Sequence, residues 1–187
     1  MKNLNEIILL IDDTIPSIAR QAIARILVEE GGYNVASSDR GLETKYGITK
    51  RWYPNVDIAN LTIPLAADIY FQDYWNFNQC GLLPDELALT FFDACVNQGG
   101  DFARKTLQKL LRVKVDGIIG PKTLNAAAAA CSLIFLTQFT RERCRAYNNL
   151  VQADISQVVN VEGWNDRALD ILIECQIIAG FGVSTHE

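Results

Sequence analysis

Two adjacent glutamates stand where a carboxylic acid could act as a proton donor. Glu29 and Glu30 end an apolar stretch with helical periodicity, and two glycines follow them. Backbone carbonyls at a helix end create a partial negative potential, which raises a carboxyl pKa when the group is also shielded from water. Cleavage of a glycosidic bond needs an acid of this kind, because the leaving oxygen must be protonated near neutral pH.

Helical spacing distinguishes the two glutamates. Glu30 follows Ile26 by four residues and continues the apolar stripe, whereas Glu29 follows Arg25 by four and can pair with it. Asp39 follows in a polar, turn-rich segment and could supply a second carboxylate opposite the first. Spacing alone leaves a simpler interpretation open, in which the glutamates are surface charges and Asp39 caps a turn.

The elements that must position these residues are mainly helical. Apolar residues recur every three or four positions over 14–30, whereas 33–51 is polar and contains a short β-favouring stretch at 45–49. Further helices are predicted at 63–75, 84–97, 101–111, 121–130, 132–154 and 166–178. The sequence therefore predicts a mainly α fold with a small β-hairpin or loop that lines the site.

Composition restricts the partners. The chain has 187 residues, of which 49% are hydrophobic and 21% charged, as in an ordinary globular protein. A net charge of −5 argues against nucleic acid as the main partner. The first apolar stretch, 7–11, is too short for a membrane span or a signal core. We therefore expect synthesis in the cytoplasm without a Sec signal.

The basic residues are concentrated in one segment. Residues 101–122 carry a local charge of +4, which leaves the rest of the chain at −9. This segment could meet an anionic polymer, or it could be the solvated face of an amphipathic helix.

Cysteine usage argues against metal sites and disulfides. The chain has five widely spaced cysteines, no CxxC pair, and a single histidine, His186. We expect buried, reduced thiols, no metal and no organic cofactor. The cysteines are Cys80, Cys95, Cys131, Cys144 and Cys175.

A long ordered motif carries a family resemblance. It consists of Glu30-Gly31-Gly32-Tyr33 followed by Asp39-Arg40-Gly41-Leu42-Glu43-Thr44-Lys45-Tyr46-Gly47-Ile48-Thr49. The motif resembles glycoside hydrolase family 108, the lysozyme-like N-acetylmuramidases, and with Tyr70 and Tyr74-Trp75 the match covers roughly residues 20–90. The resemblance implies a lysozyme-like helical fold in which Glu30 is the catalytic acid and Asp39 and Thr44 take part in catalysis.

The resemblance also implies residues that contact the substrate. Tyr33 and Tyr46 flank the proposed acid in polar sequence, whereas tyrosines and tryptophans at helical spacing are more often core residues. The candidate substrate-binding residues are Tyr33, Tyr46, Tyr74, Trp75 and Asn97. This chain departs from the family pattern at Arg40, Leu42 and Glu43, which add bulk and charge to the hairpin.

The second half resembles the predicted peptidoglycan-binding domain that is usually fused to these enzymes. The matching residues are Phe92-Asp93-Ala94-Cys95-Val96-Asn97-Gln98-Gly99, Leu107-Gln108, Asp116-Gly117-Ile118-Ile119-Gly120-Pro121-Lys122-Thr123-Leu124 and Gly163-Trp164-Asn165-Asp166-Arg167. We therefore expect a lysozyme-like catalytic region at 1–90 and a helical peptidoglycan-binding region at 91–187, packed into one compact unit.

Together the resemblances imply a peptidoglycan hydrolase that cleaves the β-1,4 bond between N-acetylmuramic acid and N-acetylglucosamine. Two alternatives stay open: a lytic transglycosylase acting on the same bond, and a non-catalytic peptidoglycan-binding protein. The expected partners are the glycan strands of peptidoglycan. Delivery to the wall or periplasm would require release through a holin, as for a phage endolysin, or a secretion system.

Overall fold

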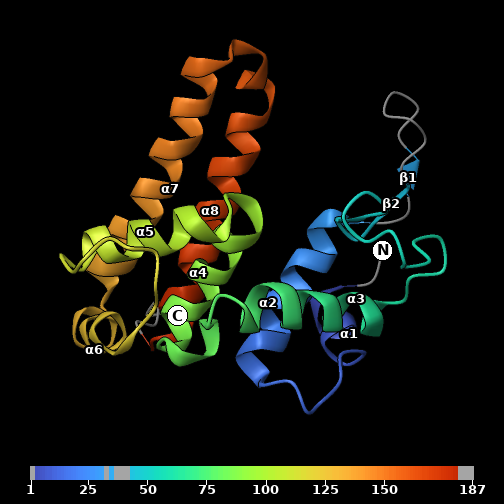
Figure 1. Ribbon diagram of the computed structural model, residues 1–187, viewed down its shortest axis with the longest axis horizontal. Coiled ribbons are helices and arrows are strands. Elements are labelled where there is room, and N and C mark those ends of the chain that lie inside the picture. The colour runs from blue at the N-terminus through green and yellow to red at the C-terminus, as the bar shows by residue number, and fades with distance from the viewer. Residues whose placement is uncertain (1–2, 32–33, 36–42, 181–187) are drawn as a thin grey trace, which may run out of the picture. The chain divides into compact units, whose positions relative to one another are not determined.

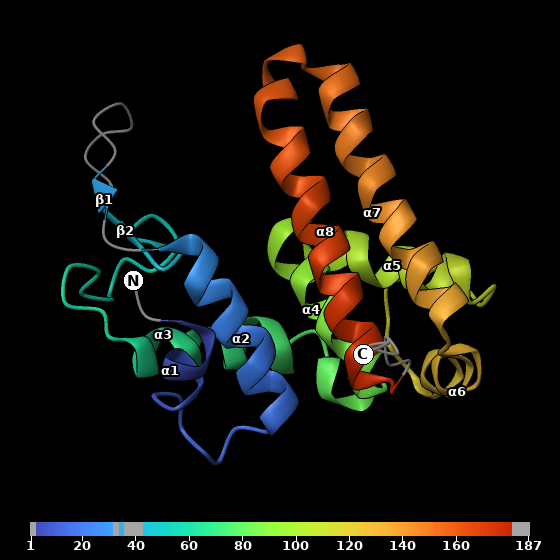
Figure 2. The same cartoon turned by 180° about the vertical axis from the view of Figure 1, so that it is seen from behind.

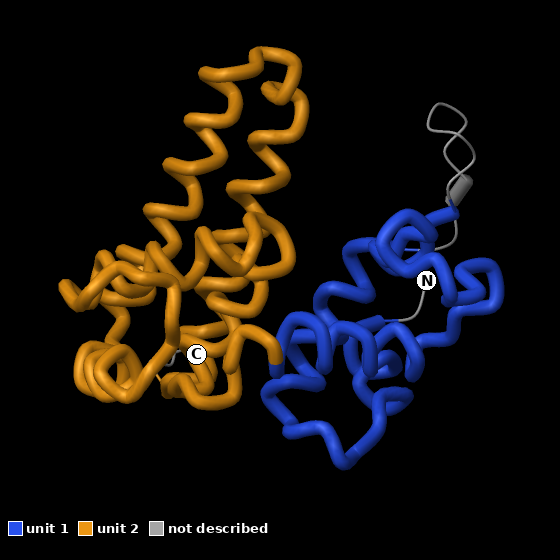
Figure 3. The backbone as a smooth tube through the Cα atoms, viewed as in Figure 1, with its two compact units in different colours: residues 1–76 blue, residues 77–187 orange. Residues whose placement is uncertain are grey.

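The computed structural model describes residues 3–31, 34–35 and 43–180. The chain forms two compact units, residues 1–76 and 77–187, coloured separately in Figure 3. The boundary predicted from the sequence, between residues 90 and 91, falls inside a helix of the second unit, Asp85–Asn97. The packing of both halves into one body stays a prediction.

The first unit has three α-helices and a small sheet among its described residues (Figure 1). Its elements are α1 (Leu4–Ile8), α2 (Ser17–Glu30), β1 (Asn34–Val35), β2 (Glu43–Lys45), β3 (Ile48–Thr49), α3 (Ile63–Tyr70) and the π-helical turn η1 (Phe71–Asn76). Helix α2 contacts both α1 and α3. This packing places the end of α2 next to the sheet that follows it in sequence.

Helix α2 has the amphipathic pattern that the sequence predicts. One face is buried, and it consists of Ala19, Ala22, Ile23, Ala24, Ile26 and Leu27. The helix ends at Gly31, whose φ of 67° is a conformation that glycine adopts more readily than other residues. Glu30 is therefore fixed as the last residue of a helix anchored along its length by apolar packing.

The small sheet confirms the predicted hairpin. Strands β1, β2 and β3 are antiparallel in that order, and Lys45 pairs with Ile48 across a two-residue turn. Both turn residues, Tyr46 and Gly47, have positive φ values of 53° and 73°. This is the type I′ geometry that matches the twist of a β-hairpin.

The second unit is entirely helical in the part that the structure describes. Its elements are η2 (Cys80–Leu82), α4 (Asp85–Asn97), α5 (Gly100–Leu110), α6 (Pro121–Ala130), α7 (Leu133–Ala153), η3 (Ile155–Gln157) and α8 (Val158–Ile178). Helices α7 and α8 run side by side as a long hairpin, which Figures 1 and 2 show from opposite sides. The mainly α fold class with a small hairpin is confirmed.

Helix α8 begins earlier than the sequence predicts. It starts at Val158 rather than at residue 166, and Gly163 lies within it. A glycine lowers helix propensity by only about 1 kcal/mol, which the packing of α8 against α4 and α7 offsets. Gly163 therefore does not break the helix.

The five cysteines are free thiols. Cys80, Cys95 and Cys175 are buried, whereas Cys131 and Cys144 are only partly buried. The expectation of buried thiols is therefore confirmed for Cys80, Cys95 and Cys175 and met only in part by Cys131, which follows the last residue of α6, and by Cys144.

The described part of the chain has neither a cluster of metal ligands nor a single helix that could span a membrane. Across residues 3–31, 34–35 and 43–180, no group of three or more His, Cys, Asp or Glu side chains could hold a metal ion. No single helix of those segments is long and apolar enough to cross a membrane. Helices α6 and α7 reach that length and apolarity only when taken together, and the pair is bent by 115°.

Candidate active site

The two glutamates at the end of α2 have different surroundings. The carboxylate of Glu29 accepts a hydrogen bond of 2.8 Å from Nε of Arg25, one helical turn earlier. This confirms the pairing predicted from the four-residue spacing. Glu30 instead lies next to the hairpin, so the sheet and the helix end meet at its carboxyl group.

Glu30 lies at the exposed end of α2. It continues the apolar stripe of the helix in sequence, but its side chain is exposed, like that of Glu29. The buried part of the stripe ends at Ile26 and Leu27, one turn before the helix end. The helical spacing therefore predicts the face on which Glu30 lies but not its exposure.

The hairpin turn contacts Glu30 closely. A Cβ atom built on Gly47 would lie 3.1 Å from Cγ and 3.2 Å from Oε2 of Glu30, and 2.6 Å from the hydroxyl oxygen of Tyr70. The Tyr70 hydroxyl donates a hydrogen bond of 2.9 Å to the carbonyl oxygen of Tyr46. Glycine is thus needed at position 47 for its backbone conformation and for space, and Tyr70 fixes the turn against the acid.

A group of tyrosines extends from this turn along α3 and η1. The rings of Tyr70 and Tyr74 are 5.4 Å apart. The hydroxyl of Tyr53 donates a hydrogen bond of 2.9 Å to Asp73 and also forms one with the hydroxyl of Tyr74. Burial, and then the bond to Asp73, raise the pKa of Tyr53. The group therefore presents neutral phenols that can hydrogen-bond to a ligand.

Besides burial, the charge of the proposed acid contributes to the raised pKa of Tyr74. Its side chain is half-buried, and its pKa is raised first by burial and also by the negative charges of Asp73 and Glu30. Tyr74 was predicted from the sequence, whereas Tyr53 and Asp73 were missed. Their hydrogen bond joins residues 20 apart, and no local pattern around Trp52-Tyr53 indicates it.

The other predicted residues of the hairpin have defined places. Thr44 is half-buried in the middle strand, where it pairs with Asn34 and Thr49. Tyr46 is half-buried at the turn, and the Lys45 ammonium lies 5.7 Å from the centre of its ring. Thr44 and Tyr46 are thus on the element that contacts Glu30.

Several predicted residues cannot be placed with Glu30. Asp39 and Tyr33 lie outside the described residues, so their roles stay predictions. Trp75 is only 2% exposed, which favours a core role over stacking on a sugar. Asn97 belongs to the second unit, where its side-chain amide donates hydrogen bonds of 2.8 and 3.1 Å to the carbonyl and carboxylate oxygens of Asp93.

Asp93 is the centre of a buried ionic network in the second unit. Its carboxylate accepts hydrogen bonds from Arg143, which is 0% exposed, and from Arg167 at 2.8 and 3.0 Å. Burial alone would lower the pKa of Arg143, but the Asp93 charge holds it above its usual value. The Arg143 guanidinium also donates to Gln98 at 3.0 Å. Asp93, Gln98 and Arg167, which belong to the second resemblance, therefore help to join α4, α7 and α8. This is a structural role.

The geometry suits a single-acid site. A carboxyl group stands at a helix end, a tight turn lies against it, and half-buried phenols stand nearby. These groups can donate a proton and hydrogen-bond to a polar ligand such as a sugar.

Two family models match the chain, one in each half. Residues 23–99 match the family model described as "Glycosyl hydrolase 108", and residues 102–169 match that described as "Predicted Peptidoglycan domain". Both resemblances are confirmed, in the predicted order. The structure of Brucella abortus SagA is similar, with a TM-score of 0.71 and 26% identity over 86% of this chain and 94% of that one. No curated protein matches the sequence.

Proposed function

We propose that this chain is an N-acetylmuramidase. The match to glycosyl hydrolase 108 precedes the match to a predicted peptidoglycan domain, an order that supports a glycosidase-type peptidoglycan enzyme. The enzyme hydrolyses the β-1,4 bond between N-acetylmuramic acid and N-acetylglucosamine. The observation that carries the proposal is the contact of the hairpin turn with the carboxyl group of Glu30, inside the segment that matches the hydrolase family.

Glu30 acts as the general acid and protonates the leaving glycosidic oxygen. A free carboxyl group on the surface is ionised at neutral pH, so the acid needs a less polar environment to hold its proton. The glycan supplies it, because a strand lying across the helix end and the hairpin excludes water from Glu30.

The neighbouring groups position the sugar. The phenols of Tyr46 and Tyr74 offer hydrogen bonds and ring faces to a glycan, and Thr44 positions the attacking water. Asp39 is proposed as the second carboxylate, which stabilises the oxocarbenium-like transition state or orients that water.

Mass spectrometry of the soluble products from purified sacculi tests the proposal. Wild-type protein should release muropeptides with reducing N-acetylmuramic acid ends. Release by Glu30→Gln should be lower by a factor of about 100 or more, because general acid catalysis contributes a factor of this order. Products ending in 1,6-anhydro-N-acetylmuramic acid would identify a lytic transglycosylase instead. Binding to sacculi with no release from several wall types would leave only the wall-binding alternative.

A further inference from the structure

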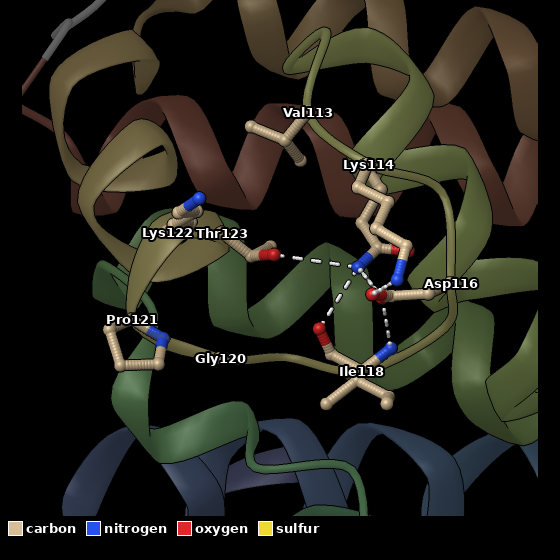
Figure 4. A pocket seen from close by; sticks show the side chains of 9 residues that line it. Val113, Lys114, Asp116, Ile118, Gly120, Pro121, Lys122 and Thr123 are labelled. Atoms are coloured by element: carbon tan, nitrogen blue, oxygen red, sulfur yellow. Dashed lines mark hydrogen bonds and ion pairs between the residues drawn. The ribbon is translucent and has the colours of Figure 1, made fainter.

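A pocket in the second unit has no role in the proposed reaction. It has a volume of about 270 Å³ and lies between the end of α5, the loop 111–120 and the start of α6 (Figure 4). Val113, Ile118 and Pro121 provide apolar lining, whereas Lys114, Asp116 and Lys122 are charged.

The pocket wall is held in shape by a buried glutamine. Gln108 is only 1% exposed, and its amide nitrogen donates hydrogen bonds of 2.8 Å to the Asp116 carboxylate and 2.9 Å to the Ile118 carbonyl. Its amide oxygen accepts one of 2.7 Å from the Gly117 backbone N–H. The loop therefore does not need to be ordered by a ligand, which lowers the entropic cost of binding.

The lining has a chemistry different from that of the Glu30 site. Lys114 and Lys122 are exposed and stand on either side of the pocket in Figure 4, and Lys114 lies 3.4 Å from Asp116. The surrounding segment 101–122 carries a charge of +4. Among the described residues no aromatic side chain lines the pocket, so these residues offer none of the flat rings on which sugars stack.

We propose that this pocket binds the peptide stem of peptidoglycan through the stem's carboxylates. The proposal rests on the proposed function, because it assigns the second unit a ligand from the same polymer. The glycan strand is close to neutral where its lactyl carboxyl groups are amide-bonded to stems, whereas the stems carry free carboxylates and alanine methyl groups. The lysines pair with the carboxylates, and the exposed Ile118 and Pro121 pack against the methyl groups.

The test uses the full chain carrying Glu30→Gln, so that no substrate is cleaved. Binding of the free stem tetrapeptide is measured by calorimetry, with and without an excess of soluble glycan strands freed of their stems by an amidase. We expect tetrapeptide binding that weakens with salt and that persists in the presence of the stem-free strands, because these bind at the Glu30 site.

Two variants distinguish binding in this pocket from general electrostatic attraction to the basic segment. Lys122→Glu should weaken tetrapeptide binding about 10-fold or more, and it does not harm α6, because acidic residues are favoured in the first turn of a helix. The matched control is Lys109→Glu, which makes the same charge change on an exposed lysine of α5 that does not line this pocket. It should change binding less than about 2-fold, since exposed charges outside a site are screened.

Three results would overturn the proposal: no tetrapeptide binding, loss of tetrapeptide binding in the presence of the stem-free strands, or equal weakening by Lys109→Glu. Failure of the muramidase proposal appears separately. It would be seen if wild-type protein did not cleave stripped glycan strands although the tetrapeptide bound.

Discussion

Replacing Gly47 by alanine places a methyl group where Tyr70 and Glu30 already stand. The new carbon would lie 2.6 Å from the Tyr70 hydroxyl oxygen, a separation that non-bonded atoms do not tolerate, and 3.1 Å from Cγ of Glu30. Tyr70 must therefore move, and its hydrogen bond to Tyr46 is lost.

The size of the effect follows from three contributions. An alanine with φ near +73° costs about 1 kcal/mol. The lost Tyr70 hydrogen bond costs about 1 kcal/mol, and repacking around the added methyl group about 1 kcal/mol more. Gly47→Ala should thus lower the free energy of unfolding of the first unit by about 3 kcal/mol.

A double-mutant cycle isolates the contact. Tyr70→Phe alone loses only the hydrogen bond, about 1 kcal/mol, but it also removes the atom that the new methyl group would meet. The double variant should therefore lose about 2 kcal/mol rather than the sum of about 4 kcal/mol. Gly31→Ala is the control for backbone strain in the same unit, because its φ is +67° and no described atom lies within 4 Å of its Cβ position. Gly180→Ala, with a φ of +71°, is the control for activity in the second unit.

Urea unfolding followed by hydrogen exchange of α2 amides measures these energies for the first unit alone. Wall-lytic activity should fall in Gly47→Ala, because the turn presses on Glu30, and should stay at the wild-type level in Gly180→Ala. If the two single effects simply add to within about 0.5 kcal/mol, the proposed contact between turn and tyrosine is absent.

Three further predictions concern the buried groups and the tyrosines. Asp93→Asn should destabilise the second unit by about 3–5 kcal/mol, because Arg143 would keep its buried charge without an anion; urea unfolding that matches wild type would contradict this. Burial raises the pKa of Cys131 and Cys175 from 9.0 to about 12, so the folded state retains thiol protons that the unfolded chain releases. This stability should be fully present below about pH 9 and be lost as the pH rises towards 12, which thermal unfolding at increasing pH measures, and an unchanged melting temperature there would refute it. Tyr74→Phe loses one hydrogen bond, about 1 kcal/mol, and should reduce turnover less than about 10-fold; a loss as large as that of an acid knockout would assign Tyr74 a different role.

The features that the sequence predicted are those with local signals. The apolar face of α2, the glycines after it and the β-favouring stretch at 45–49 predict a helix end beside a hairpin, and the pairing of Arg25 with Glu29 follows from helical spacing. Helix α1 has such a signal too, since Asn3 and Glu6 form a capping box, but it is only five residues long and was missed.

The features that the sequence did not predict depend on distant residues. Asp93 bonds to arginines 50 and 74 positions later, and no local pattern indicates which charges will share a core. The exposure of Glu30 was missed for a similar reason, because spacing gives the face of the helix but not how far the neighbouring elements extend over its end.

The most direct test of the central claim compares two adjacent and chemically identical substitutions. Reducing ends released from sacculi are counted for Glu29→Gln, which removes a carboxylate paired with Arg25, and for Glu30→Gln, which removes the one beside the hairpin turn. Activity near wild type is expected for Glu29→Gln and a loss of about 100-fold or more for Glu30→Gln, with both variants folded. Equal activities in the two variants would contradict the assignment of Glu30 as the acid.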